Sequence, residues 1–315
     1  MSEPNLSDSA AVIELTGVSR HFGQTIALNR VNLTVPRGGV FGLIGGNGAG
    51  KTTLIKHILG MLTPREGTVR VFGLDPVQHP VETLGRIGYL SEDRDLPDWM
   101  RVGELIRYTQ AFYPTWDETY AEELRQAFEL DVNSRVKSLS RGQRARAGLL
   151  ISLAYRPDLL VLDEPSSGLD PVVRRDILSA IIRTIADEGR TVLFSSHLLD
   201  EVERVADHVA MIHQGQIILS ATMDDMKEQH RRLTLRFAHP VETAPILAGA
   251  LTSSGRGHEW TYICSGERSD LMVAASSLGA SVIEDATMSL DEIFVARVLN
   301  RRNATTSEMQ TSQRH

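Results

Sequence analysis

Cysteine is nearly absent from this chain of 315 residues, which contains only Cys264. A single cysteine excludes an internal disulfide and a cysteine-rich metal site, and it fits a reducing cytoplasm. The spacing of the histidines along the sequence is not that of metal ligands either, so we do not expect a zinc site.

Long apolar runs are missing as well. No stretch approaches the ~18 consecutive apolar residues of a membrane-spanning helix, and the most apolar segments, such as residues 159–162, are only as long as a strand. Residues 1–10 are polar and lack the cationic and apolar parts of a secretory signal, so we expect a flexible N-terminus.

Positive charge is not in excess. The net charge is −7 and the isoelectric point is near 5.8. A surface that follows nucleic-acid phosphates usually makes a domain basic, so we expect no nucleic-acid partner.

What the sequence does contain is an alternation of strand and helix patterns. β-Branched and apolar segments predict strands at 12–18, 26–35, 39–44, 68–72, 87–90, 159–162, 191–195 and 208–212. Apolar residues at helical spacing predict helices at 51–62, 102–112, 119–130, 172–186 and 198–205. The fold class expected is α/β, with a parallel sheet covered by helices and an inserted helical subdomain at about 95–155.

A second, shorter pattern follows residue 220. Strands are predicted at 233–237, 259–264 and 281–285, and helices at 270–278 and 290–299. The length of the chain allows one large domain and a small one. We therefore expect a large domain at 11–220, a small accessory α+β domain at 221–300 and a disordered tail at 301–315.

Gly45 begins a glycine-rich segment, GGNGAGKT, with the spacing of a phosphate-binding P-loop. Its glycines allow backbone N–H groups to converge on phosphates, and the helix that starts near Lys51 points its positive end at them. Lys51 is expected to reach the β- and γ-phosphates of a nucleoside triphosphate, and the Thr52 hydroxyl to ligate Mg²⁺. Many unrelated NTPases share this spacing, so the motif alone predicts only that a triphosphate is held.

Asp163 and Glu164 end a strand-length apolar run, LLVLDE. A buried parallel strand is almost entirely apolar, and α/β sheets bind ligands at the C-terminal ends of their strands. Asp163 is expected to hold Mg²⁺ through water, and Glu164 is the candidate general base that orients an attacking water.

Ser140 belongs to the most informative segment of the chain, Leu139-Ser140-Arg141-Gly142-Gln143. Ser140 and Gln143 have the spacing of a capping box, so we predict a helix from about Gly142 to Ala154 whose N-terminus is an anion site. An LSxGQ segment between a P-loop and an apolar run ending in Asp-Glu resembles the nucleotide-binding subunit of ATP-binding-cassette (ABC) transporters. The resemblance covers roughly residues 11–220, and it implies a P-loop NTPase cassette with a helical signature subdomain.

The resemblance also implies the roles of individual residues. His197 matches the family's switch histidine, which contacts the γ-phosphate, and Asp170 matches the loop that contacts the opposite subunit. Phe22 stands where the family stacks an aromatic ring on adenine, with core packing as the alternative and GTP not excluded. The residues expected to bind ATP are Phe22, Gly45, Asn47, Gly48, Ala49, Gly50, Lys51, Thr52, Thr53, Ser140, Gly142, Gln143 and Asp170. The residues expected to be catalytic are Glu164, His197 and Lys51, and the expected Mg²⁺ ligands are Thr52, Glu92 and Asp163.

Three positions depart from the family's pattern. Gly46 replaces the usual proline, which should loosen the P-loop slightly without removing a ligand. Glu92 follows an Ile-Gly-Tyr strand, where the family has its Q-loop glutamine; it can still ligate Mg²⁺, but it brings a third carboxylate to the site. Arg141 replaces the first glycine of the signature and adds a cation beside the anion site.

The function implied by the resemblance is that of the cytoplasmic ATPase subunit of an ABC exporter, peripheral on the inner face of the cell membrane. ATP would close two cassettes head to tail, as a homodimer or a heterodimer, and hydrolysis would reopen them. A separate integral membrane permease would dock beside Glu92 and the helical subdomain. Residues 289–294 resemble the C-terminal domain of drug-, antibiotic- and polysaccharide-exporting cassettes.

Two alternatives remain at this point. A soluble ABC ATPase acting on ribosomes or DNA usually carries two cassettes or a long coiled-coil insertion, and basic surfaces, whereas this chain has one P-loop, no heptad run and an acidic balance. A small-molecule kinase built on a P-loop would not need the segment 140–143 or the Asp170 loop.

Overall fold

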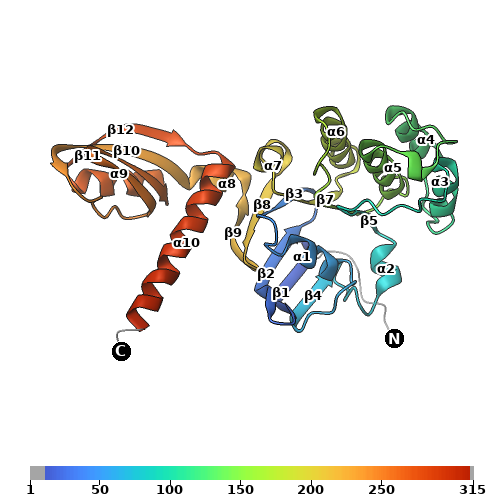
Figure 1. Cartoon of the computed structure of the whole chain (residues 1–315), viewed down its shortest axis with the longest axis horizontal. Helices are drawn as coiled ribbons and strands as arrows, with labels where there is room; N and C mark the ends of the chain where they lie inside the picture. The colour runs from blue at the N-terminus through green and yellow to red at the C-terminus, as the bar shows by residue number, and fades with distance from the viewer. Residues whose placement is uncertain (1–10, 313–315) are drawn as a thin grey trace. The chain divides into compact units, whose positions relative to one another are not determined.

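The computed structural model describes residues 11–312, apart from the side chains at 181, 183–188 and 302–312. The chain divides into two compact units, which separate between Ser220 and Ala221, and each unit is described by itself (Figure 1). The flexible segment predicted at 1–10 lies outside the described residues. Among the residues described, no helix is long and apolar enough to cross a bilayer.

The elements of the first unit follow the predicted alternation of strands and helices. In chain order they are β1 (Ala11–Phe22), β2 (Thr25–Pro36), β3 (Gly39–Ile44), α1 (Lys51–Ile58), β4 (Glu66–Val71), α2 (Pro80–Leu84), β5 (Ile87–Leu90), α3 (Val102–Gln110), α4 (Glu118–Ala127), the 3-10 turn η1 (Val136–Ser138), α5 (Arg141–Leu153), β6 (Leu159–Asp163), α6 (Pro171–Glu188), β7 (Thr191–Ser196), α7 (Leu199–Val205), β8 (His208–His213) and β9 (Gln216–Thr222).

A six-stranded sheet organises this unit, in the order β5-β6-β7-β3-β8-β9. The neighbours from β5 to β8 pair in parallel, and all residues of β6 and β7 are buried, as expected for parallel strands that are covered on both faces. Helices α6 and α7 pack against β3 and β7, whereas α1 packs against β6 on the opposite face (Figure 1). The C-terminal ends of β3, β6 and β7 therefore lie side by side, where α/β folds bind ligands.

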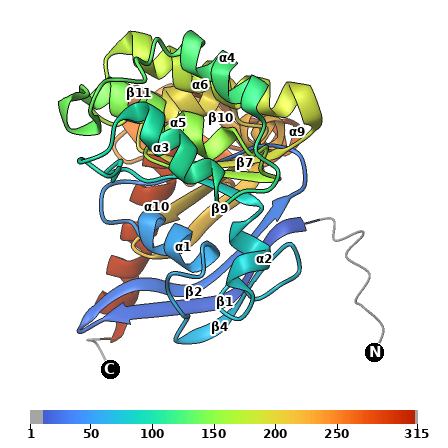
Figure 2. The ribbon, with the colours of Figure 1, turned by 90° about the vertical axis from the view of Figure 1, so that its right-hand side faces the viewer.

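A smaller antiparallel sheet, in the order β2-β1-β4, lies on the α1 side of the large one (Figure 2). Helix α1 contacts both β2 and β4 of this sheet as well as β6. Side chains from both sheets and from α1 form one buried cluster, which includes Leu15, Leu33, Leu54 and Val161. This shared core packs α1 between two sheets, and α1 begins at the P-loop lysine.

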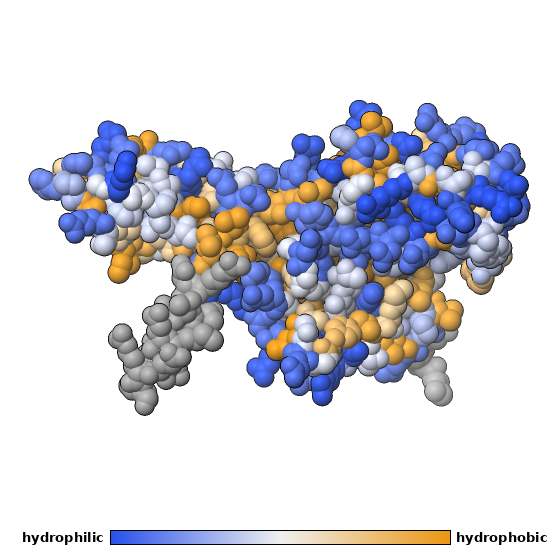
Figure 3. All heavy atoms as spheres, in the orientation of Figure 1, coloured by the Kyte–Doolittle hydropathy of each residue, from blue (hydrophilic) through white to orange (hydrophobic). Residues whose placement is uncertain are grey.

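Helices α3, α4 and α5 form the part of the unit that the sequence predicts as an inserted subdomain, and the face seen in Figure 3 is mostly hydrophilic there. Asp117 caps α4 by accepting a hydrogen bond from the Tyr120 N–H, 2.9 Å away. Helix α5 packs on β5. Gly148 allows that approach, because a Cβ there would lie 2.6 Å from Leu90 Cδ1.

The second unit is a three-stranded antiparallel sheet, β11-β10-β12, with helices on it. Its elements are α8 (Met223–Glu228), β10 (His230–Val241), β11 (Ala250–Ser265), α9 (Arg268–Ser277), β12 (Ala280–Thr287) and α10 (Leu290–Ser312). Arg297 of α10 donates from Nη2 to His230 Nε2, 2.7 Å away, and to Ser265 Oγ, also 2.7 Å away. His230 Nδ1 lies 2.7 Å from the Met226 carbonyl, and burial, partly offset by that hydrogen bond, lowers the pKa of His230. The neutral ring therefore fits both contacts, and it ties α10 to the sheet.

Several predicted boundaries are wrong. The helix predicted at 51–62 ends at Ile58, because Gly60 adopts a left-handed φ of 68° and its N–H donates to the His57 carbonyl. Helix α10 continues through Ser312, although a disordered tail is predicted at 301–315; residues 301–312 contain no glycine or proline to end a helix. Residues 313–315 of that tail lie outside the described residues. The short elements α2, α8 and β9 are not predicted at all.

Candidate functional site

The P-loop connects β3 to α1 and leaves no room for side chains at two of its glycines. A Cβ at Gly45 would lie 2.4 Å from the Ile212 carbonyl oxygen, and one at Gly50, whose φ is 113°, would lie 2.7 Å from that of Ala27. No side chain caps the N-terminus of α1. Its first N–H groups thus remain available to an anion, as in phosphate-binding loops.

Gly46, where a proline is usual in the family, has space around it. A Cβ at Gly46 would meet no atom within 4 Å, so the loop does not require glycine at this position. Its carbonyl accepts a hydrogen bond from Lys51 Nζ at 3.2 Å, which keeps the lysine beside the loop.

Lys51, Glu164 and His197 come together at the C-terminal ends of β3, β6 and β7. Lys51 Nζ lies 3.0 Å from Glu164 Oε1, and His197 Nδ1 lies 2.6 Å from Glu164 Oε2. Glu164 is 4% exposed and has a left-handed φ of 48°, a conformation that is sparsely populated outside glycine and is often found at functional sites. These are the three residues that the sequence predicts as catalytic, and the fold brings them into contact.

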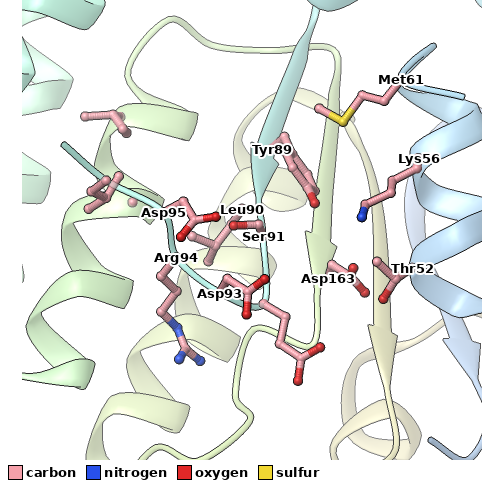
Figure 4. Close-up of a pocket in the computed structure, with 14 residues that line it drawn as sticks. Thr52, Lys56, Met61, Tyr89, Leu90, Ser91, Asp93, Arg94, Asp95 and Asp163 are labelled. Atoms are coloured by element: carbon pink, nitrogen blue, oxygen red, sulfur yellow. The ribbon is translucent and has the colours of Figure 1, made fainter. Parts of the chain in front are cut away.

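Thr52, Glu92 and Asp163 line one cavity of about 410 Å³. Figure 4 shows Thr52 and Asp163 there together with Lys56 and Tyr89. Asp163 is 1% exposed, and its Oδ2 has no hydrogen-bond partner among the described residues. A hydroxyl and carboxylates of this kind suit Mg²⁺, which takes oxygen ligands and keeps several waters. The residues present therefore fit the metal that the sequence predicts.

Ser195 is a site residue that sequence reasoning assigned no role. Its hydroxyl donates to Asp163 Oδ1 at 2.7 Å and accepts from the Glu164 N–H at 3.0 Å. Ser195 thus orients one carboxylate and holds the backbone of the other. The only signal in the sequence is its position two residues before His197, at the end of a strand.

The signature segment forms the predicted capping box. The Ser140 hydroxyl accepts from the Gln143 N–H at 3.2 Å, and the Gln143 side chain accepts from the Ser140 N–H at 2.9 Å. Helix α5 begins at Arg141, one residue before the predicted start. Ser140 and Gln143 line neither the metal-side cavity nor the hollow of about 340 Å³ beside the P-loop, which is lined by Asn47, Lys51, Thr53 and Glu164 among others. Neither cavity beside the P-loop of its own chain is therefore lined by these two signature residues.

Asp170 and Phe22 line neither of those two cavities, but Phe22 pairs across the β1–β2 hairpin with Thr25, which lines the hollow beside the P-loop. Asp170 Oδ1 accepts from the Val172 and Val173 N–H groups, at 3.0 and 3.1 Å, at the start of α6. Phe22 is 46% exposed at the end of β1, and the Arg20 guanidinium lies 5.0 Å from its ring centroid. This exposure contradicts the core-packing alternative for Phe22.

Comparison with known proteins identifies the family. The family model described as "ABC transporter" matches residues 28–167. The bacitracin transport ATP-binding protein BcrA of Enterococcus faecalis is 30% identical over 77% of this chain and 79% of its own length. The chain belongs to the ATP-binding proteins of ABC transporters.

The similarity of this ABC ATPase to its relatives extends through the second unit. The ABC transporter ATP-binding protein YtrB of Bacillus subtilis is 27% identical over 92% of this chain and 99% of its own length. A solved structure described as the ATP-binding subunit of an ABC transporter superposes with a TM-score of 0.63 at 29% identity, covering 69% of this chain and 92% of that one. The predicted family and P-loop cassette fold are confirmed. As a member of this family the protein binds and hydrolyses ATP and acts with a membrane partner.

Substituting Glu92 by glutamine, the family's usual residue, tests whether Glu92 of this ABC ATPase acts as a metal ligand. If Glu92 is a metal ligand, Glu92→Gln should keep ATP turnover within about threefold of the parent, because an amide oxygen also ligates Mg²⁺. A Mg²⁺ titration of the ATPase rate of both proteins checks this. A hundredfold loss of turnover at unchanged Mg²⁺ dependence would instead make Glu92 a second base.

Proposed function

We propose that this ABC ATPase hydrolyses ATP in composite sites, each made by the P-loop of one cassette and the signature of a second. The observation that carries the proposal is the Ser140 capping box at the start of α5. It presents a helix N-terminus, which is an anion site, yet it lines neither cavity beside the P-loop of its own chain. A nucleotide held by a second cassette would supply the anion.

On the P-loop side, different residues of the same chain would bind the phosphates and activate the water. Backbone N–H groups from Gly48 to Thr52 and Lys51 Nζ would bind the β- and γ-phosphates. Glu164 would accept a proton from the attacking water, which requires that its pairing with Lys51 gives way to phosphate. His197, 2.6 Å from Glu164 Oε2, would orient that carboxylate and contact the γ-phosphate.

Thr52, Asp163 and Glu92 would hold Mg²⁺, which when bound would neutralise charge on the phosphates. Ser195 supports this by fixing one oxygen of Asp163 and leaving Oδ2 available. The second cassette would contribute Ser140, Gly142, Gln143 and Asp170, and Phe22 would stack on the base.

The hydrolysis would drive export through a separate integral membrane permease, with this subunit peripheral on the inner face of the membrane. The similarity to the bacitracin transport protein BcrA supports a drug or antibiotic as cargo. Residues 221–300 would act as an accessory domain, which the nearly full-length similarity to YtrB supports. The similarities are to transporter subunits and do not favour the ribosome- or DNA-acting alternative.

The dependence of ATPase activity on protein concentration tests the composite site. If two chains build each site, phosphate release per chain at saturating ATP should rise with protein concentration and then level off, because dimer formation follows mass action. Size-exclusion chromatography of Glu164→Gln with ATP and with ADP is the matched control, and only ATP should yield dimer. A constant rate per chain across the range in which the protein is monomeric would contradict the proposal.

A further inference from the structure

Arg94 joins two loops that lie far apart in the sequence. It is 3% exposed, and its Nη2 donates to the Pro165 and Ser167 carbonyls, each 3.0 Å away. Pro165 directly follows Glu164, and Arg94 follows Glu92 by two residues. The guanidinium therefore connects the segment that carries Glu92 to the loop between Glu164 and Asp170, which we call the 165–170 loop.

The backbone at both ends of this connection is held in an uncommon conformation. Arg94 has a left-handed φ of 51° and Glu164 one of 48°. Such conformations outside glycine persist only where surrounding contacts over-determine them. In Figure 4, Arg94 lies across the pocket from Thr52 and Lys56, so it does not itself face the expected phosphate side.

Burying the charge of Arg94 costs free energy, so its two hydrogen bonds to carbonyl groups need an explanation. The side chain is buried, and an arginine remains charged at neutral pH. A buried cation is stable only when it is hydrogen-bonded or paired. An apolar side chain could fill the same space without that cost, so packing alone does not explain an arginine here.

Other residues hold the same loop from other sides. The Ser166 hydroxyl donates to the buried Glu201 of α7, and Arg174 Nε of α6 donates to the Leu169 carbonyl at 2.9 Å. The Arg141 guanidinium lies against Gly168, since a Cβ there would be 2.3 Å from Arg141 Nη1. Arg94 is the contact that the Glu92 segment contributes.

We propose that Arg94 is a positioning residue. Through its contacts with the 165–170 loop, it couples the position of the Glu92 segment to the positions of Glu164 and Asp170. Displacement of the Glu92 segment would then move the general base and the face offered to the second cassette together. The inference rests on the proposed function of Glu164, and it adds a residue that lines the metal-side cavity opposite Thr52 and hydrogen-bonds to loop carbonyls.

Arg94→Met, which removes the two donors and keeps much of the length, tests this in the full chain. We expect kcat for ATP hydrolysis to fall by at least about tenfold, because small misplacement of a catalytic group is costly. The KM for ATP should stay within about threefold of the parent, since the P-loop is untouched. Arg94→Lys, whose ammonium can still donate to carbonyls, should recover part of the lost kcat.

Arg86→Met is the matched control. Arg86 pairs with Asp158, Nε to Oδ2 at 2.6 Å, and both residues precede their strands, β5 and β6, at the end of the sheet away from the site. Its kcat should equal that of the parent. The proposal is overturned if Arg94→Met keeps kcat within twofold of the parent, or if Arg86→Met loses as much.

Two further measurements keep the result interpretable. If circular dichroism shows that Arg94→Met does not fold, Arg94→Lys and Arg94→Gln replace it. A kcat equal to that of the parent in both variants would overturn the proposal. Glu164→Gln is assayed beside them. Full activity of Glu164→Gln would contradict the proposed function itself, whereas loss in Glu164→Gln with none at Arg94 would contradict only the positioning role.

Discussion

Glu164→Gln should lose ATP turnover by ~10²–10⁴, the usual cost of removing a positioned general base, and it should still bind ATP. The amide has nearly the same size as the carboxylate and cannot accept the proton of the attacking water. It also removes the negative charge 3.0 Å from Lys51 Nζ, so the lysine meets less competition for the γ-phosphate. ATP affinity should therefore stay the same or increase.

Steady-state phosphate release and equilibrium binding of a fluorescent ATP analogue measure the two effects separately. Glu82→Gln is the matched control, because Glu82 lies exposed on α2 beside His79, away from the site, and it should behave as the parent does. Turnover of Glu164→Gln within twofold of the parent would remove Glu164 from the role of base.

The parts of the fold that the sequence predicts are those with a local cause. Strands 39–44 and 87–90 coincide with β3 and β5 because each is a short apolar run bounded by turn residues. The start of α5 is predicted because a capping box places both partners within four residues of each other. The P-loop is predicted for the same reason, since its spacing is contiguous.

The contacts that the sequence does not predict join residues far apart in the chain. Ser195 reaches Asp163, and Arg94 reaches Pro165, which stands 71 positions later. No local sequence pattern predicts either contact. The parallel pairing of β6 and β7 creates the first contact, and the turn after β5 creates the second. Helix α2 has only five residues, too few for an apolar face to be recognised. Such elements depend on tertiary packing more than on local propensity.

Two inactive chains should restore activity when they are mixed. Lys51→Ala removes the cation that binds the phosphates of its own chain's ATP, and Ser140→Arg blocks the signature that faces the ATP of the other chain. In a mixed dimer one composite site carries both lesions and the other carries neither. With random pairing, the mixture should recover roughly a quarter of the parent rate.

The ATPase rate of this mixture, measured on protein shown to contain mixed dimers and folded by circular dichroism, tests the composite site most directly. A mixture of Lys51→Ala with Glu164→Gln is the control: both lesions act on the ATP of their own chain, so no site is intact and no activity should return. Recovery in the first mixture and none in the second is the predicted result. No recovery in the first mixture would contradict a signature that acts on the ATP of a second copy of this chain.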